Sequence, residues 1–236
     1  PLIYFLRPNT SRLRLTRTHW ELQPVLKSAA NGSSEFMTNI SMSIVTMLYN
    51  WQLLRLMGAD GVTVFGIIMY VSFIFVALFL GYSMGSAPIV SFHYGAGNQE
   101  ELRGLFRQSL TIILSMSVGL TLLAIVLAKP LAMIFVSYDP ALLSVTTRAL
   151  AIYAVSYLLT GFNIYASSFF TALNDGLVSA LISFARTLVF QVLAVLTLPL
   201  LWEADGIWAA VILAEGLAAI LSLACFLRFR KKYGYA

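Results

Sequence analysis

Long uncharged apolar stretches alternate with short polar segments along most of this 236-residue chain. The longest of them, from Gly61 to Phe92, contains no charged residue. A helix needs about 20 mainly apolar residues to cross the hydrocarbon core of a bilayer, because each residue adds about 1.5 Å. Six stretches reach or approach this length, at about 35–57, 61–92, 107–128, 143–173, 177–202 and 206–229. The pattern predicts an all-α polytopic membrane protein, built as a bundle of six transmembrane helices.

The composition supports a membrane protein and offers little catalytic chemistry. The chain is 59% hydrophobic and 11% charged, whereas a water-soluble fold of this length needs more polar residues to cover its surface. The single cysteine, Cys225, excludes a disulfide framework within the chain. The two histidines, His19 and His93, lie far apart and without metal-ligand spacing, and no phosphate-binding loop is present. We therefore predict no enzyme, no catalytic residue, no metal site and no organic cofactor.

The positive charge is distributed as a topology signal. With six crossings, eleven of the fifteen basic residues fall on one side of the membrane, and an excess of Lys and Arg marks the cytoplasmic side. These eleven are Arg7, Arg12, Arg14, Arg17, Lys27, Arg103, Arg107, Arg228, Arg230, Lys231 and Lys232. We expect a multi-pass protein of the inner (plasma) membrane, with both ends of this chain cytoplasmic. The basic side chains then lie near lipid headgroups, and we expect no nucleic-acid partner.

The first residues, Pro1–Leu6, are apolar but too few to cross a bilayer, and arginines follow them closely. We interpret residues 1–6 as the end of a preceding transmembrane helix. Residues 7–34 are expected to form a cytoplasmic linker, with an amphipathic piece around Trp20–Leu26 lying along the membrane interface. Residues 231–236 are expected to form a cytoplasmic tail.

Polar side chains interrupt the first and fourth predicted spans. Polar groups in hydrocarbon are unfavourable without partners, so these faces should point to other helices or to a water-filled cavity. Hydrogen bonds between helices readily explain Ser and Thr, but an amide needs more partners. Asn39 and Asn50 in the first span and Asn163 in the fourth are therefore candidates to line a cavity or to coordinate an ion.

Three ionisable residues lie at membrane depth, where charges are usually paired or functional. Arg186 and Glu215 fall at similar depths on consecutive antiparallel helices, so we predict a structural ion pair between them. Glu35 has no evident basic partner and begins the most polar span. Two interpretations stay open for it: a residue that couples a proton or cation, or a helix N-terminal charge beside residues 31–34.

The segment Pro88–Asn98 reads PIVSFHYGAGN and is followed by Arg103. It resembles the segment after the eighth helix of multidrug and toxic compound extrusion (MATE) transporters, whose pattern is P-x-x-S-x-x-x-G-A-x-N. The matching positions are Pro88, Ser91, Gly95, Ala96 and Asn98. Ala166–Phe170 and Asp205–Ala210 also resemble the end of that family's tenth helix and the start of its twelfth. Pro88 is expected to end or bend the helix, and the glycines to make a tight cytoplasmic turn.

The resemblance covers about residues 32–230 and implies a two-lobed transporter, each lobe a six-helix bundle, that works by alternating access. Residues 35–230 resemble its C-terminal lobe, residues 1–6 the end of its sixth helix, and residues 7–34 its inter-lobe linker. The implied partners are the N-terminal lobe of the same protein, missing from this chain, a small-molecule substrate and membrane lipid. The only cofactor-like species is the coupling ion, H⁺ or Na⁺. Some relatives carry a coupling acid near the position of Ser43, and others carry such acids in the first lobe.

We therefore expect a cation-coupled antiporter that exports drugs or other amphipathic or cationic compounds. An alternative within transport is a lipid-linked saccharide flippase of the related superfamily, which should place more basic residues on its cavity. An alternative of a different class is a non-transporting membrane subunit or scaffold.

Overall fold

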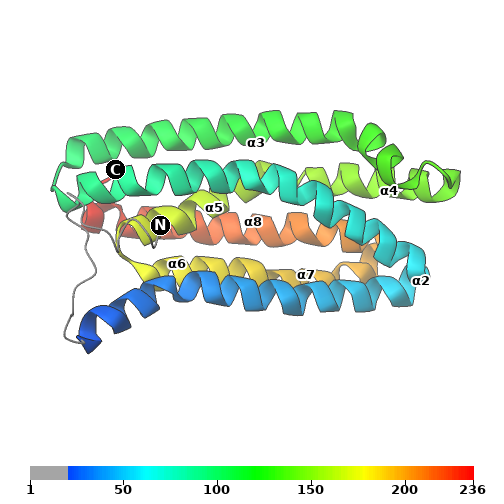
Figure 1. The fold of residues 1–236 in the computed structure, drawn as a ribbon, viewed down its shortest axis with the longest axis horizontal. Helices are drawn as coiled ribbons and strands as arrows, with labels where there is room; N and C mark the ends of the chain where they lie inside the picture. The colour runs from blue at the N-terminus through cyan, green and yellow to red at the C-terminus, as the bar shows by residue number, and fades with distance from the viewer. Residues whose placement is uncertain (1–20) are drawn as a thin grey trace, which may run out of the picture.

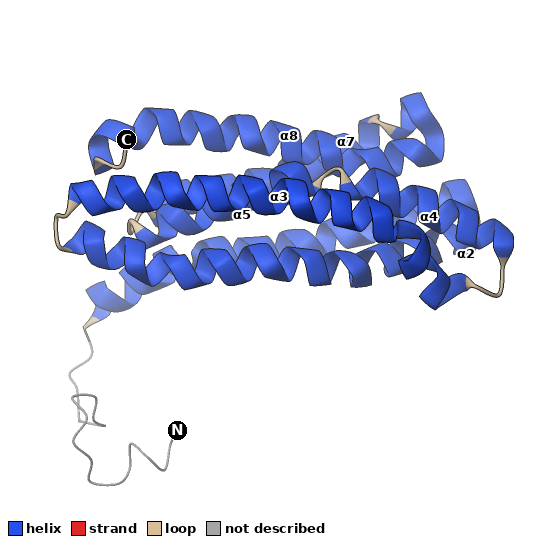
Figure 2. Ribbon diagram, turned by 90° about the horizontal axis from the view of Figure 1, so that it is seen from above, coloured by secondary structure: helices blue, strands red, loops and turns tan. Residues whose placement is uncertain are grey.

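The computed structural model describes residues 21–236, and this part consists of helices joined by short loops and turns, without a strand (Figures 1 and 2). Within it, several side chains between residues 24 and 38, including that of Glu35, are outside the description. The elements are α2 (Leu22–Gly95), α3 (Gln99–Val136), α4 (Pro140–Ala154), α5 (Tyr157–Ala172), α6 (Gly176–Phe184), the π-helix η1 (Ala185–Phe190), α7 (Gln191–Thr197) and α8 (Pro199–Tyr233). The predicted all-α class is confirmed.

Helix α2 makes two crossings, because it turns back on itself at Gly58. Gly58 has φ +67° and ψ −151°, a conformation that glycine adopts readily and other residues do not. The two halves of α2 then run in opposite directions (Figure 1). The apolar part of α2, Asn39–Gly95, has 57 residues, far more than one span requires.

Four further crossings complete the bundle. Helix α3 is one, and the α4–α5 pair, bent by 47°, is a second. Helices α6 and α7, joined by η1, form a third, and α8 forms the fourth. The described chain therefore crosses six times, as predicted, and the blue start of α2 lies at the same end of the bundle as the C-terminus (Figure 1). We call this the basic end, because it carries Arg103, Arg107 and residues 228–232, and the other the Gly58 end.

The helices differ from the predicted spans mainly at their ends. Helix α2 already begins at Leu22, so residues 22–34 continue the first crossing as helix. Helix α3 extends beyond residues 107–128 in both directions and runs through Pro130 to Val136. The fourth span, predicted over 143–173, begins at Pro140 and breaks between α4 and α5. The fifth ends at Thr197, before residue 202, and α8 contains non-helical backbone at Trp202 and Glu203 before the sixth crossing. Residues 1–20 lie outside the described chain.

Pro88 was expected to end or bend its helix, and the first of these alternatives is wrong. Helix α2 continues through Pro88 to Gly95, and the turn to α3 occupies residues 96–98. Gly97 supplies the positive φ of this turn, +70°. The Asn98 side chain then caps α3 by accepting a hydrogen bond from the Glu101 backbone N–H at 3.2 Å. Flexible turn residues therefore decide where the chain reverses, and a proline within an apolar helix does not.

Helix α5 packs most closely against its neighbours at Gly161. A β-carbon at this position would lie 2.5 Å from a ring carbon of Phe79 on α2 and 2.7 Å from the Ser117 hydroxyl on α3. Phe79 is fully buried, so neither neighbour is a loose surface side chain. The lack of a side chain at Gly161 thus allows three helices to meet in the bundle centre.

The last residues of the chain are packed into the basic end. Tyr235 is buried among Phe106, Phe169 and Phe226, and its hydroxyl donates to the Phe226 carbonyl at 2.8 Å. The Arg103 Nε–H donates to the Gly234 carbonyl at 3.0 Å. Residues 234–235 of the predicted tail therefore join α3, α5 and α8.

The carboxylate of Asp175, at the turn between α5 and α6, links α6 to the end of α8 at the basic end of the bundle. Asp175 caps α6 by accepting from the Val178 N–H at 3.3 Å, and it also accepts from the Tyr233 hydroxyl and the Lys232 ammonium. Partial burial by itself raises the pKa of Asp175, but the hydrogen bonds outweigh it and hold this pKa below its usual value.

Candidate functional site

A buried ion pair lies at the centre of the site. The Glu215 carboxylate, on α8, accepts from the Nε of Arg186 at 2.9 and 3.1 Å, and the Nη2 of Arg186 lies 2.9 Å from the same carboxylate. The Glu215 side chain is only 4% exposed, and that of Arg186 is 18% exposed. The expected contact between these residues is present, with the planar two-nitrogen geometry that suits an arginine and a carboxylate. Its contribution to stability stays a prediction.

Asn163, on α5, binds the same carboxylate. Its Nδ2 donates to Glu215 Oε2 at 2.7 Å and to the Glu215 backbone carbonyl at 3.0 Å. Its Oδ1 accepts from the Ser222 hydroxyl at 3.0 Å. Asn163 is fully buried, so every polar atom of its amide is used inside the bundle. We call Arg186, Glu215, Asn163 and Ser222 the Glu215 network.

The π-helix η1 carries Arg186 toward this network. Its hydrogen bonds span one residue more per turn than those of an α-helix, so the side chains on either side of it are rotated relative to an unbroken helix. Short π-helical segments of this kind occur frequently at functional sites. Sequence periodicity gives no signal for η1, because the change from α-helical to π-helical hydrogen bonding leaves no mark in the apolar pattern.

Two tyrosines lie on helices that pack against α8: Tyr49 on α2 is buried, and Tyr153 on α4 is half-buried. The Tyr49 hydroxyl donates to Gln191 Oε1 at 2.9 Å, and its ring stacks on Phe65 at 5.0 Å. The contacts of the Glu215 carboxylate come from α5 and η1, so three helical elements meet at this acid. Neither tyrosine was predicted, because an aromatic residue in an apolar span carries no signal of its own.

The other predicted site residues lie apart from the network, on the first half of α2. Asn39 and Ser43 are exposed and Asn50 is half-buried. The Ser43 hydroxyl donates to the Asn39 backbone carbonyl at 3.2 Å. The structure therefore separates the predicted set: Asn163 joins the ion pair, and the α2 residues occupy an outer face. We call Asn39, Ser43 and Asn50 the α2 polar face.

Glu35 belongs to α2, and its side chain lies outside the described part of the structure. One interpretation of it is nevertheless wrong. The helix begins at Leu22, so Glu35 and residues 31–34 are well inside it and cannot act at its N-terminus. A coupling role for Glu35 stays a prediction.

A family model named MatE matches residues 36–196 of this chain, which include most of the first crossing and the four that follow it. The match covers more than half of the sequence. The chain belongs to the MatE family. This confirms the resemblance carried by the Pro88–Asn98 segment, and it places the protein among multi-pass membrane proteins.

Solved MATE structures have the same fold. A structure of "MATE in complex with MaL6" superposes with a TM-score of 0.86 at 20% identity, over 98% of this chain and 52% of that one. A MOP superfamily transporter from Pyrococcus furiosus, described as having a binding pocket of reverse polarity, gives a TM-score of 0.80 at 22% identity, over 91% and 48%. The Vibrio cholerae MATE transporter VcmN in its bent form gives 0.81 at 17%, over 90% and 48%. This chain thus spans about half the length of the transporters it matches. No curated protein matches it.

The MATE motif lies at the basic end of the bundle and away from the middle of the helices. Pro88, Ser91 and Gly95 belong to the last turns of the second crossing, and Ala96 and Asn98 to the turn before α3. Its clearest structural contribution is the Asn98 cap of α3. The motif therefore helps to form a connection between two helices.

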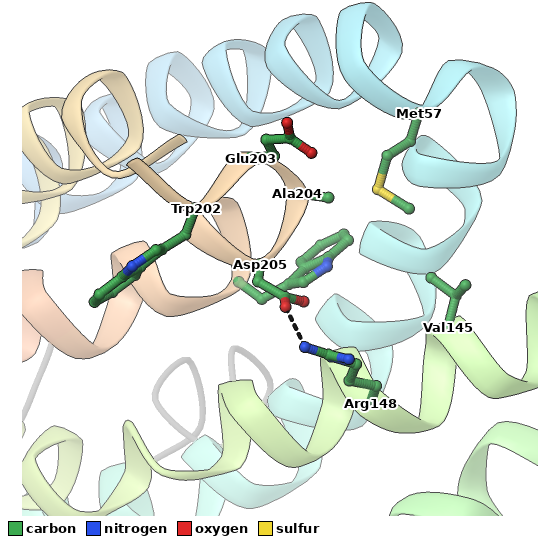
Figure 3. A pocket seen from close by; sticks show the side chains of 8 residues that line it. Met57, Val145, Arg148, Trp202, Glu203, Ala204 and Asp205 are labelled. Atoms are coloured by element: carbon green, nitrogen blue, oxygen red, sulfur yellow. Dashed lines mark hydrogen bonds and ion pairs between the residues drawn. The ribbon is translucent and has the colours of Figure 1, made fainter. Parts of the chain in front are cut away.

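A pocket of about 250 Å³ opens at the Gly58 end (Figure 3). Its lining includes Met57, Trp202 and Glu203, together with an ion pair between Arg148 on α4 and Asp205 on α8. These charged side chains are 70% and 41% exposed, so their pair contributes little to stability. Glu203 has φ +47°, which is strained for a residue with a side chain. The sequence analysis did not identify this pocket, because it forms where the backbone of α8 breaks.

Proposed function

We propose that this chain acts as the C-terminal lobe of a cation-coupled antiporter, which exports drugs or other amphipathic or cationic compounds by alternating access. The observation that carries the proposal is the match to MATE transporters over nearly all of this chain and half of theirs. A six-helix lobe that corresponds to half of a transporter needs a second lobe to enclose a pathway, so the N-terminal lobe is the proposed partner.

The α2 polar face supports a pathway on the outside of this lobe. Amide and hydroxyl groups are unfavourable against lipid tails, yet Asn39 and Ser43 are exposed here at membrane depth. A water-filled cavity between two lobes would solvate these groups and accept an amphipathic substrate. Glu35, on the same helix, remains a candidate for coupling ions at this cavity.

The charge distribution supports an orientation with the basic end in the cytoplasm. Arg103, Arg107 and the basic residues of 228–232 lie at this end, and the excess of Lys and Arg marks the cytoplasmic side of a membrane protein. The proposed location is the inner (plasma) membrane. The Gly58 end, with the pocket beside Trp202, then faces outward.

The charges at membrane depth favour export of cations over flipping of an anionic lipid-linked saccharide. Such a flippase should offer uncompensated basic groups to its substrate. In the described crossings, Arg186 is the arginine deepest in the bundle, and its guanidinium is neutralised by Glu215. A cationic or neutral amphipathic substrate meets no such conflict.

The proposal is tested by measuring ethidium accumulation in cells that express this lobe together with its proposed N-terminal lobe, as one native polypeptide. Export lowers ethidium accumulation relative to cells with an empty vector. If a proton uncoupler restores accumulation, protons drive the export; if replacing sodium restores it, sodium does. Accumulation equal to that of control cells, with the protein present in the membrane, would contradict export and favour the scaffold alternative.

A further inference from the structure

A continuous chain of hydroxyl groups runs between α5 and α6. The Thr171 hydroxyl donates to the Ser179 Oγ at 2.7 Å, Ser179 and Ser167 share a hydrogen bond of 2.9 Å, and Ser167 and Ser183 share one of 2.7 Å. Ser179 is fully buried and Ser183 is nearly so. We call Ser167, Thr171, Ser179 and Ser183 the hydroxyl seam.

One end of the seam lies at the basic end of the bundle. Thr171 occupies the last turn of α5, and it is half-buried. Asp175, the cap of α6, accepts the Ser179 N–H on its own backbone carbonyl at 3.2 Å. The seam therefore begins within one helical turn of an ionised carboxylate that reaches solvent beside Lys232.

The other end of the seam approaches the Glu215 network from two helices. On α5, Asn163 lies one turn before Ser167, so the two share a helix face. On the opposite side, Arg186 follows Ser183 by three residues. Asn163 and Arg186 are the residues that hold the Glu215 carboxylate. Two rows of polar side chains thus converge on one buried acid.

The chemistry of the seam suits protons better than metal ions. A hydroxyl has one O–H donor and two acceptor lone pairs, so it can accept a proton from one neighbour and release its own to the next. Each oxygen of the Ser167–Ser179 and Ser167–Ser183 contacts is a hydroxyl that can both donate and accept, so the geometry is compatible with either direction of these bonds. No carboxylate belongs to the seam itself, whereas a sodium site would need oxygen atoms free to coordinate the ion.

We propose that the hydroxyl seam conducts protons between the basic end of the bundle and Glu215. Within the seam, each hydroxyl accepts a proton from one neighbour and releases its own to the next. Among the described side chains, Ser167 and Ser183 make no hydrogen bond to Glu215, so a water molecule accepts the proton there and releases one of its own to the carboxylate, while Arg186 keeps its charge. Arg186 and Asn163 hold this acid inside the bundle. The inference rests on the proposed antiport and makes the proton the coupling ion.

Proteoliposomes test the seam separately from the antiport itself. The native polypeptide is reconstituted with a pH-sensitive dye inside, ethidium is added, and the rate of the internal pH change is recorded. Equilibrium ethidium binding and the melting temperature in detergent are measured in parallel. Ser167→Ala and Ser183→Ala are the test variants, and Ser183→Thr retains a hydroxyl. Ser109→Ala is the matched control, because Ser109 is buried like Ser183 and accepts from the Tyr82 hydroxyl at another interface, at 3.0 Å.

The seam predicts a specific pattern. Ser167→Ala and Ser183→Ala slow proton movement by about tenfold or more, since a positioned proton-transfer group typically contributes at least that much. Ethidium binding and melting stay close to wild type, and Ser183→Thr and Ser109→Ala move protons at the wild-type rate. If both alanine variants move protons at the wild-type rate, the seam proposal is wrong, but the proposed antiport is not affected. If the wild type carries ethidium without any pH change, the proton antiport is itself wrong and the seam inference falls with it.

Discussion

The Glu215 network and the α2 polar face are both polar groups set in apolar helices, yet the structure treats them oppositely. Asn163 uses all of its amide atoms inside the bundle, on Glu215 and Ser222. Asn39 and Ser43 lie on an exposed face of α2. A polar residue in a membrane helix is therefore a stabilising or relay element on the packed side, and a candidate substrate or ion contact on the open side.

Removing one partner of the buried ion pair is expected to have the largest effect on stability. Glu215→Gln leaves the Arg186 guanidinium uncompensated, and such losses typically cost about 3–5 kcal/mol. Thermal unfolding in detergent should show this as a large fall in melting temperature. The double variant Arg186→Met with Glu215→Leu should recover most of the stability, because neither charge remains. A Glu215→Gln protein that melts like wild type would mean that the pair does not hold the packed side together.

Filling the closest helix contact tests the packed side without changing charge. The β-carbon of Gly161→Ala would meet the Phe79 ring, and overpacking of this kind costs about 1–3 kcal/mol. Gly119→Ala, at a helical glycine with open space around it, is the control and should be neutral or slightly stabilising. Equal melting temperatures for the two variants would show that α5 can move away from α2 at little cost.

Matched asparagine substitutions separate the two regions most directly. Asn163→Ala leaves the Glu215 and Ser222 groups short of a partner, which should cost about 1–3 kcal/mol. Asn50→Ala, on the α2 polar face, should change the melting temperature little and reduce ethidium export instead. Chemical or thermal unfolding and ethidium accumulation are measured on both variants. Equal losses of stability would remove the distinction between the packed and the open side.

Acidification should produce the smallest of these effects, at the basic end. The pKa of Asp175 is lowered in the folded protein, so its contribution to stability is present above the ordinary aspartate pKa of about 4 and is lost as pH falls through the folded value. The melting temperature should therefore fall more steeply below about pH 4 in wild type than in Asp175→Asn. Parallel curves for the two proteins would show that the contacts of Asp175 with Tyr233 and Lys232 add nothing measurable.

The sequence was sufficient for the number of crossings and for the Arg186–Glu215 contact. Each long apolar stretch has about the length that a helix needs to cross the hydrocarbon core. Arg186 and Glu215 lie at similar depths on consecutive helices. It was not sufficient to place Asn163 in the same network. That contact depends on which face of α5 turns toward α8, and the close packing at Gly161 helps to set this arrangement.

The apolar pattern of the sequence also could not predict where the helices end or break. Pro88 and Pro130 both lie inside helices, because neighbouring helices and the apolar surroundings keep the chain helical through a missing N–H. The reversal at Gly58 and the break at Trp202 and Glu203 depend on local backbone angles, which apolar periodicity does not report.

The π-helix η1 also affects how this chain is aligned with its relatives. One additional residue is accommodated within residues 185–190, so a relative with an unbroken α-helix there should align with a one-residue gap. Positions before Ala185 and after Phe190 then match in different registers. An ungapped alignment would assign the roles of Arg186 and Gln191 to neighbours that point in other directions, and a mutation transferred between homologues on that basis would probe the wrong side of the helix.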